Sequence, residues 1–387
     1  MSSAATTTAT GSGAGPLGLG VVLPDLRVGG LQSMAVRLLL SLPRDEFAPR
    51  VYTFDPGGED GPLAAELAAA GVAHVFRARP PGRAPGYAAR LAGALRSDGI
   101  DLVHCHNITA LYHGARAAHR AGRLPVLFTE HDREMPAPWK HRLLHRWIVR
   151  RARLVVAVSD RLRGELVRYE GFPAARTSTL FNGVPDPRDD FDGDRDTARA
   201  ELGWDARPVA LAVGSLTEVK NHAGLIRAWG EVRRRVPEAR LCLAGCGELE
   251  SDLRRRAGGL PDGAVELLGE RHDVARLLAA CDVFVLPSHR EGLSLSLIEA
   301  HGAGRASVAY DVGGNAEVLR DGVTGWLVPP GNEAALAASL VSALAGRSGR
   351  APLEQAARGR FLEAFTHERM VARYLDLYRR LCPRKVA

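Results

Sequence analysis

Long hydrophobic runs are missing from this sequence of 387 residues. No apolar stretch approaches the ~20 residues that a membrane-spanning helix requires, so no spanning helix is expected. The first residues, MSSAATTTATGSGAGP, have neither the basic region nor the apolar core of a secretory signal, and we expect residues 1–16 to form a disordered tail. The expected location is the cytoplasm, including the inner face of the membrane.

Cysteine is scarce as well: the chain has five, an odd number, and most of them lie inside apolar runs. Such a set does not predict a disulfide framework, and a free cysteine in an apolar run acts as a small core residue. Cys242-x3-Cys246 lacks a second pair of ligands, so no zinc site is predicted. The strings Asp192-x-Asp194 and Asp194-x-Asp196 lie in a polar stretch and not at the end of an apolar strand, so we reject them as metal ligands.

The composition is that of an ordinary soluble globular protein, with 46% hydrophobic and 25% charged residues. The net charge of +7 would suit nucleic acid, an anionic membrane face or an anionic substrate. Nucleic acid is not expected as a partner, because no nucleic-acid-binding motif is present. A chain of this length predicts two domains, each with its own core.

Strand-like and helix-like segments alternate along most of the chain. From Leu17, apolar runs such as GLGVVLP, DLVHCH and LVVAVS are separated by helical segments, and the alternation resumes at RPVALAV. This pattern predicts α/β domains with parallel sheets that are covered on both faces. Between the two halves, residues 185–197 (PDPRDDFDGDRDT) change to Asp, Pro and Gly without an apolar period, which predicts an interdomain linker.

The most informative stretch is 282–332. DVFVLP is strand-like, the polar turn SHREG follows, LSLSLIEA has helical spacing and ASVAY is a second buried strand, which predicts a β-turn-α-β unit. Ligands bind at such turns in open α/β sheets. Glu291 and Glu299 would stand roughly 12 Å apart along the helix axis, which is too far for a glycosidase pair at about 5–9.5 Å. They suit the two ends of a long ligand, with Gly292 and the first N–H groups of the helix facing a phosphate between them; two solvated glutamates on a surface helix are the alternative.

The run EGLSLSLIEAHGAG…DVGGNAEVLRDGVTGWLVPPGN resembles the nucleotide-sugar site of the retaining glycosyltransferases of family 4. The resemblance implies the GT-B fold, an α/β architecture of two Rossmann-like, doubly wound parallel-sheet domains that face a central cleft. It covers nearly the whole chain and is strongest over 213–332. Two positions depart from the family pattern: Ser294 stands where Gly is usual, and Ala306 where Pro is usual. The implied organisation is a tail (1–16), an acceptor-side domain (17–184), a linker (185–199), a nucleotide-sugar-binding domain (200–364) and a final helix that returns to the first domain (365–387).

The resemblance also implies which residues hold the donor. Glu291 would bind the sugar hydroxyls, Glu299 the ribose, and Lys220, in the string GSLTEVKNH, the phosphates; many relatives have an Arg at the position of Ser215. His131, in TEHDREM, would lie beside the donor sugar and the acceptor, and a loop histidine bonded to nearby backbone is the alternative. Catalytic roles are thus expected for Glu291, Lys220 and His131, and donor binding for Gly29, Gly30, Ser215, Lys220, Arg271, Glu291, Gly292, Leu293, Ser294 and Glu299.

Three further features each admit two interpretations. The pair Gly29-Gly30 would lie against the donor's pyrophosphate in the resembling family, but a tight turn requires glycine in any case. His104 and His106 share one face of a strand, and a strand end is favoured over a metal site because a third ligand is missing nearby. The segment 139–153 (WKHRLLHRWIVRRAR), with two Trp and six Lys/Arg, would either associate with an anionic membrane or pack as a crossover helix with a solvated basic face.

The implied reaction is transfer of a glycosyl group from a UDP- or GDP-sugar to an acceptor hydroxyl, with retention of configuration and without a metal ion or other cofactor. The acceptor would be a glycan or lipid-linked sugar of cell-surface glycan biosynthesis, or alternatively a small molecule such as an aminoglycoside-type natural product. A nucleotide-sugar 2-epimerase shares the fold but lacks the Glu-x7-Glu string, and a phosphorylase would need a Schiff-base lysine in a chain where lysine is scarce. A non-catalytic nucleotide-sugar-binding protein is the rival of another class.

Overall fold

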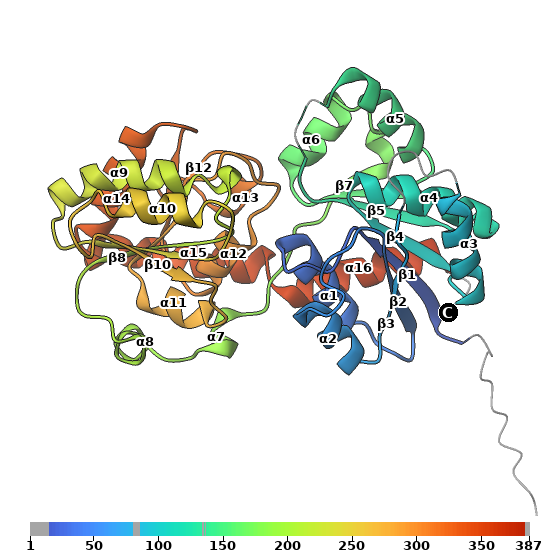
Figure 1. The fold of residues 1–387 in the computed structure, drawn as a ribbon, viewed down its shortest axis with the longest axis horizontal. Helices are drawn as coiled ribbons and strands as arrows, with labels where there is room; N and C mark the ends of the chain where they lie inside the picture. The colour runs from blue at the N-terminus through green and yellow to red at the C-terminus, as the bar shows by residue number, and fades with distance from the viewer. Residues whose placement is uncertain (1–14, 80–85, 134, 136, 384–387) are drawn as a thin grey trace, which may run out of the picture. The chain divides into compact units, whose positions relative to one another are not determined.

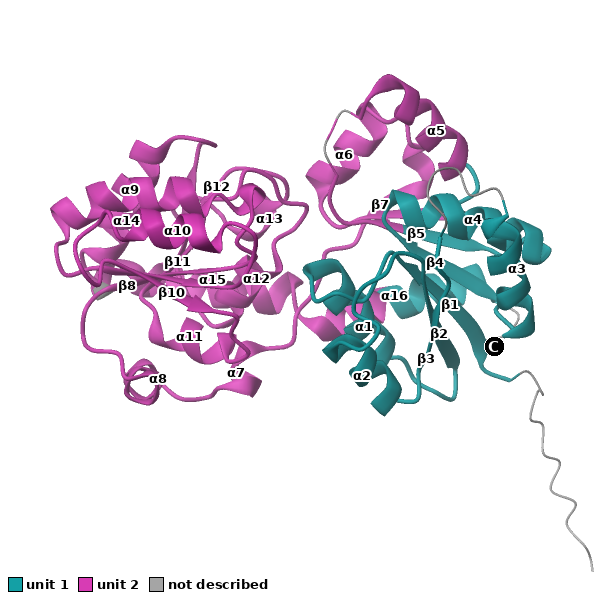
Figure 2. Cartoon of the chain, viewed as in Figure 1, with its two compact units in different colours: residues 1–128, 150–153, 374–387 teal, residues 129–149, 154–373 magenta. Residues whose placement is uncertain are grey.

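The computed structural model describes residues 15–79, 86–133, 135 and 137–383. The chain divides into two compact units (Figure 2): unit 1 comprises 1–128, 150–153 and 374–387, and unit 2 comprises 129–149 and 154–373. The boundary after Phe128 falls inside a strand, and residues 185–199, where the linker is predicted, belong to unit 2; the linker stays a prediction. Residues 1–14 of the predicted tail lie outside the described residues.

Two β-sheets form the framework (Figure 1). Among the described residues, one sheet has seven strands in the order β3-β2-β1-β4-β5-β6-β7 and the other has six in the order β10-β9-β8-β11-β12-β13. Strand pairs such as β1 with β2 and β11 with β12 run parallel, and both orders reverse direction beside the first strand, as in doubly wound sheets. This confirms the predicted α/β class. The strands are β1 (Leu17–Leu23), β2 (Phe47–Thr53), β3 (Ala73–Phe76), β4 (Leu102–His106), β5 (Val126–Glu130), β6 (Leu154–Ala157), β7 (Thr177–Thr179), β8 (Val209–Val213), β9 (Arg240–Ala244), β10 (Val265–Gly269), β11 (Val283–Leu286), β12 (Ser307–Tyr310) and β13 (Gly325–Val328).

The helices arise from the amphipathic segments between the strands. In α9, Leu225, Trp229 and Val232 recur at helical spacing and are buried in the core of the second sheet, whereas Arg234 and Arg235 are exposed. Helices α9, α10 and α14 cover one face of this sheet, and α11 lies on the other (Figure 1). The helices are α1 (Gly30–Leu40), α2 (Pro62–Ala69), α3 (Tyr87–Ser97), α4 (Ile108–Gly122), α5 (Trp139–Val149), α6 (Asp160–Arg168), α7 (Pro187–Asp190), α8 (Arg195–Leu202), α9 (His222–Arg235), α10 (Glu250–Ala257), α11 (Val274–Ala280), α12 (Leu295–Gly302), α13 (Asn315–Val318), α14 (Glu333–Leu344), α15 (Arg347–Ala364) and α16 (His367–Leu381).

Helix α7 and the first three residues of α8 lie in the segment 185–197, which lacks an apolar period. Side-chain caps at their N-termini explain why they form. The Asp186 carboxylate accepts a hydrogen bond from the N–H of Arg188 (3.0 Å), and the Asp194 carboxylate accepts one from the N–H of Thr197 (2.9 Å). Asp194, a member of both rejected Asp-x-Asp strings, is thus a helix cap. In the part of the chain that the structure describes, no group of three or more His, Cys, Asp or Glu side chains could hold a metal ion.

The paired histidines of β4 lie inside unit 1. His104 and His106 are fully buried with their ring centroids 4.0 Å apart, and the Tyr378 hydroxyl lies 2.9 Å from His104 Nδ1. Tyr378 belongs to the end of α16, so this end of the helix packs against β4 within unit 1. Within the described ranges, no helix is both long and apolar enough to cross a membrane.

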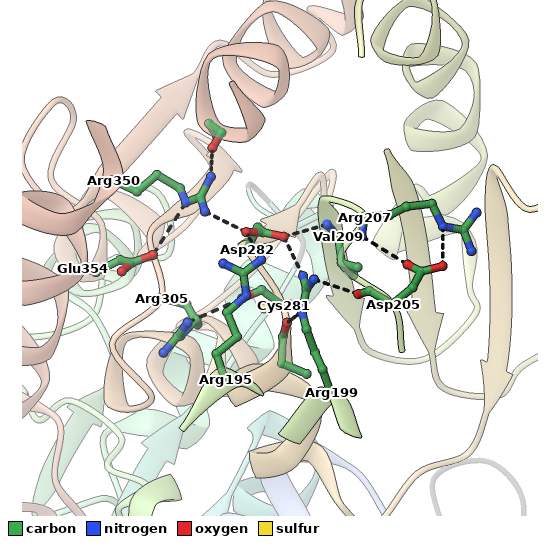
Figure 3. A network of polar contacts seen from close by, with 12 residues as sticks. Arg195, Arg199, Asp205, Arg207, Val209, Cys281, Asp282, Arg305, Arg350 and Glu354 are labelled. Carbon is green, nitrogen blue, oxygen red and sulfur yellow. Dashed lines mark hydrogen bonds and ion pairs between the residues drawn. The ribbon is translucent and has the colours of Figure 1, made fainter. Parts of the chain in front are cut away.

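An arginine cluster surrounds Asp282 at the amino end of β11 (Figure 3). The carboxylate is 4% exposed and lies 2.5 Å from Arg195, 2.8 Å from Arg199 and 2.7 Å from Arg350. It also accepts a hydrogen bond from the N–H of Val209 (2.8 Å). Because these partners come from α8, α15 and β8, the single carboxylate ties three elements to the start of β11.

Candidate active site

Three turns at the carboxyl ends of neighbouring strands form the candidate site, which lies in unit 2. They follow β8 (214–221), β11 (287–294) and β12 (311–314), and the order β8-β11-β12 makes the strands neighbours. The N–H of His289 donates to the carbonyl of Val219 (2.8 Å), and the N–H of Gly314 donates to the carbonyl of Gly292 (2.9 Å). These bonds join the strings GSLTEVKN, SHREGLS and DVGG, which are far apart in the sequence.

Lys220 and Glu291 meet where the first two turns join. Lys220 Nζ lies 2.6 Å from Glu291 Oε1, and their side chains are 22% and 9% exposed. A charge-assisted contact of this length at low exposure is stronger than a surface ion pair. The sequence assigned these two residues to different parts of the donor, so their direct pairing is a finding of the structure.

Asn221 sets the position of the Lys220 turn. Its backbone has φ of 52°, in the left-handed region, and it begins α9 by accepting a hydrogen bond from the N–H of Gly224 (3.2 Å). Its amide nitrogen donates to the carbonyl of Pro287 (3.1 Å), at the end of β11. The buried Asn221 side chain therefore connects the two turns that carry Lys220 and Glu291. Sequence reasoning missed this residue, although an Asn directly before an amphipathic helix is a detectable N-cap signal.

Two glycines allow the backbones of the site to approach closely. A Cβ at Gly292 would overlap the carbonyl oxygen of His131, and a Cβ at Gly313 would overlap the carbonyl oxygen of Glu291. Gly313 also has φ of 51°, which L residues rarely adopt. Any side chain at either position would push the turns apart and move the Glu291 carboxylate.

Helix α12 begins later than the apolar spacing suggested. It starts at Leu295, and Ser294 is its N-cap, with the hydroxyl accepting a hydrogen bond from the N–H of Leu297 (3.4 Å). Glu291 therefore lies in the turn, and the separation of roughly 12 Å calculated from helical rise does not apply to it. Ser294 has φ of −71°, so its backbone needs no glycine. Leu293 is buried, and Glu299 is partly buried in the second turn of α12.

His131 follows β5 and lies against the same turn. Its ring is buried, and this burial lowers the pKa of His131 to about 3, so the imidazole is neutral at physiological pH. Its neighbour Asp132 accepts a hydrogen bond from Arg290 Nε (3.0 Å). A neutral imidazole here can donate a hydrogen bond to a ligand or accept one from it, but it adds no positive charge to the site.

The remaining predicted residues have other partners or belong to unit 1. Arg271 forms two hydrogen bonds with the carboxylate of Asp273 (2.7 and 2.6 Å) in the turn after β10. Ser215 is exposed, and its hydroxyl lies 3.5 Å from that of Thr217. Gly29 and Gly30 belong to unit 1, where Gly29 is the N-cap of α1 and Gly30 its first residue.

Glu317 of α13 is a further residue that sequence reasoning missed. Its carboxylate accepts hydrogen bonds from the N–H groups of Asp160 (2.8 Å) and Arg161 (2.9 Å), at the start of α6. Burial raises the pKa of the Glu317 carboxyl. A carboxylate at a helix N-terminus is favoured by the helix dipole, and this one connects α6 with the turn after β12. Glu317 lies over 150 residues from Asp160 and Arg161 in the sequence, so no local pattern predicts the contact.

Two family models match most of this chain. A family model described as Glycosyltransferase Family 4 matches residues 28–188, and one described as Glycosyl transferases group 1 matches residues 207–346. The alpha-maltose-1-phosphate synthase of Mycobacterium tuberculosis is 30% identical over 324 residues, which cover 76% of this chain and 82% of that protein.

Two further similarities concern about half of the chain and the fold. The alpha-D-kanosaminyltransferase of Streptomyces kanamyceticus is 32% identical over 213 residues, and the match covers 53% of this chain and 54% of that protein. The crystal structure of HepE from Anabaena in complex with UDP and glucose matches with a TM-score of 0.79 at 21% identity, over 93% of this chain and 98% of that one. At this level of identity the similarity concerns the fold.

Proposed function

Because the chain belongs to glycosyltransferase family 4 and has the GT-B fold, we propose that it is a retaining hexosyltransferase that works without a metal ion or other cofactor. It transfers a sugar from a nucleotide sugar to the hydroxyl of an acceptor. One observation supports the proposed chemistry above all. The Lys220 ammonium and the Glu291 carboxylate are 2.6 Å apart in the turns that lead into α9 and α12.

The proposed reaction is a front-face displacement. The acceptor hydroxyl attacks the anomeric carbon on the side from which the nucleoside diphosphate leaves, the bond from carbon to phosphate oxygen breaks, and the departing phosphate accepts the hydroxyl proton. Negative charge therefore grows on the phosphate, where Lys220 and the first N–H groups of α12 stabilise it. A bound phosphate competes with Glu291 for Lys220. Donor binding thus releases the Glu291 carboxylate to hold the sugar hydroxyls.

For the donor we propose a UDP- or GDP-hexose, and for the acceptor an intermediate of cell-surface glycan synthesis in the cytoplasm. The UDP in the HepE complex supports the choice of a nucleoside diphosphate. A second candidate is glycosylation of a small natural product, because the chain is 32% identical to alpha-D-kanosaminyltransferase over half its length. A non-catalytic binding protein is disfavoured, because binding alone does not require a charged pair beside the helix N-terminus.

Transfer in excess EDTA tests the proposed chemistry. The protein is incubated with a panel of UDP- and GDP-hexoses and sugar acceptors, and the product is analysed by proton NMR. We expect transfer to continue in EDTA, and the anomeric coupling of the new bond to match that of the donor. Inversion would contradict front-face displacement, and loss of transfer that magnesium or manganese restores would contradict metal independence. If the donor remains unchanged with every acceptor, the result would favour a non-catalytic binding protein over a transferase.

The two glutamates are expected to respond differently to removal of their charge. Glu299→Gln should mainly raise KM for the donor and weaken binding of the nucleoside diphosphate, since ribose contacts are alike in ground and transition states. Glu291→Gln should lower kcat by roughly tenfold or more, because a charge-assisted contact to the sugar is lost. Because the same substitution frees Lys220 for phosphate, the affinity for the nucleoside diphosphate should be unchanged or higher. Kinetics and calorimetric titration measure both, and the reverse pattern would exchange the two assignments.

A further inference from the structure

Helix α5 exposes an unusual number of large apolar side chains. Eight such side chains are exposed in the part of the chain that the structure describes, and four of them belong to this one helix of 11 residues. Soluble proteins seldom gather exposed apolar groups on a single element without a partner for them. The four are Trp139 (66% exposed), Leu143 (58%), Leu144 (43%) and Trp147 (43%).

The exposed groups form a stripe that points away from the protein. Because each residue turns a helix by about 100°, Trp139, Leu143 and Trp147 share a stripe about 80° wide, and Leu144 borders it. The opposite face of α5 holds His145 and its buried apolar neighbours. An ordinary surface helix is apolar on its inner face only, whereas α5 is apolar on its outer face too.

Basic side chains flank this stripe on both sides. Arg146 and Arg142 lie along one edge, and Lys140 lies beside Trp147 on the other, with its ammonium 5.6 Å from the ring centre of Trp139. The whole segment 139–153 contains no acidic residue. An apolar ridge between cations is the pattern of helices that lie in the interface of an anionic bilayer, where long basic side chains reach the headgroups.

The helix is held in place from its inner face. His145 Nδ1 lies 2.8 Å from Glu170 Oε2, and Glu170 also accepts a hydrogen bond from the N–H of Ala137, just before α5. Arg133 lies 3.6 Å from the same carboxylate. These buried contacts keep α5 folded before its outer face docks. Docking would therefore not carry the cost in conformational entropy of forming the helix.

We propose that α5 docks the enzyme on a bilayer that contains anionic lipid. The docking surface, called the α5 surface below, consists of Trp139, Lys140, Leu143, Leu144, Arg146 and Trp147. A second copy of the chain is a poorer occupant, because a two-fold contact through α5 would set these cations against the same cations with no acidic residue in the segment to offset them. Docking is independent of the proposed reaction.

The test is sedimentation of the full chain with lipid vesicles at low salt. Vesicles of phosphatidylcholine with phosphatidylglycerol are compared with phosphatidylcholine alone, and the variant is Trp139→Ser/Leu143→Ser/Trp147→Ser. We expect the wild type to bind the anionic vesicles, less so as salt rises, and the variant to bind roughly tenfold more weakly or worse. Lys140→Gln and Arg146→Gln should each weaken binding roughly fivefold. Trp fluorescence should shift to the blue on binding, since two of the five Trp belong to the α5 surface.

The matched control is Val323→Ser/Leu362→Ser, which removes two apolar side chains of similar exposure (50% and 46%) from elsewhere in unit 2. This control should bind vesicles like the wild type, and all variants should retain transfer to a soluble acceptor.

Equal binding by the Trp139/Leu143/Trp147 variant, or no binding by the wild type, would overturn the proposal. Light scattering would assign the surface to a second copy if the wild type forms a dimer and binds no lipid, and the Trp139/Leu143/Trp147 variant is a monomer. Equal binding to polyglutamate and to anionic vesicles would assign it to an acidic polymer. A chain that binds vesicles but transfers no sugar would leave docking intact and defeat only the proposed reaction.

Discussion

Replacing Lys220 with alanine is expected to lower kcat/KM by roughly ten- to a hundredfold, because a charge-assisted contact is worth about 1.5–3 kcal/mol. The loss should appear in kcat more than in KM, since the phosphate gains its charge as the bond to the sugar breaks. Steady-state kinetics with the donor varied would measure both parameters. Lys140→Ala, which removes the charge of an exposed lysine in α5, is the control and should leave kinetics with a soluble acceptor unchanged.

The ion pair with Glu291 makes a second variant necessary. Lys220→Ala leaves a mostly buried carboxylate without its partner 2.6 Å away, and this alone would disturb the site. If Lys220 serves only to neutralise Glu291, the double variant Lys220→Ala/Glu291→Gln should be as active as Glu291→Gln alone. If Lys220 stabilises the leaving phosphate, the double variant should be slower than Glu291→Gln alone. A double variant that is as active as Glu291→Gln, or a Lys220→Ala variant with normal kinetics, would remove Lys220 from catalysis.

Asp282→Asn is expected to cost about 3–5 kcal/mol of unfolding free energy, because removing one partner from a buried ion cluster leaves uncompensated charge. Three guanidinium groups, from Arg195, Arg199 and Arg350, lie within 2.8 Å of this carboxylate (Figure 3). Urea unfolding followed by circular dichroism would measure the loss. The cluster lies at the amino end of β11 and the candidate site at its carboxyl end, so the fraction that folds should keep a near-normal kcat/KM.

The matched control for this prediction is Asp205→Asn. Asp205 pairs with Arg207 at 2.8 Å, but both side chains are well exposed, so the pair should contribute only about 0–1 kcal/mol. A similar loss in both variants would mean that burial does not govern the contribution of Asp282. If Asp282→Asn does not accumulate as folded protein, Arg195→Met, which removes the most exposed of the three arginines, should still lower the unfolding free energy measurably.

The sequence by itself determined the fold class and predicted the main turn of the candidate site. Alternating apolar runs and amphipathic segments predict parallel α/β sheets, since each such segment can bury its apolar side only as part of a layered structure. The Glu291–Glu299 string was recognisable because its residues are close together in the chain. Helix α5 was also predicted near its observed position (Trp139–Val149) from composition and spacing.

Only the tertiary structure decided which groups meet. Lys220 and Glu291 are 71 residues apart, and their contact depends on β8 and β11 being neighbours in the sheet. The contacts that Asn221 and Glu317 make with distant segments also depend on the tertiary arrangement of the strands, and so does the unit boundary after Phe128. The orientation of α5 was likewise undecided by its sequence, because both of its faces carry apolar residues and only packing selects the buried one. Local periodicity encodes an element and its amphipathic character, whereas partners across strands are chosen by the order of the strands, which no single segment contains.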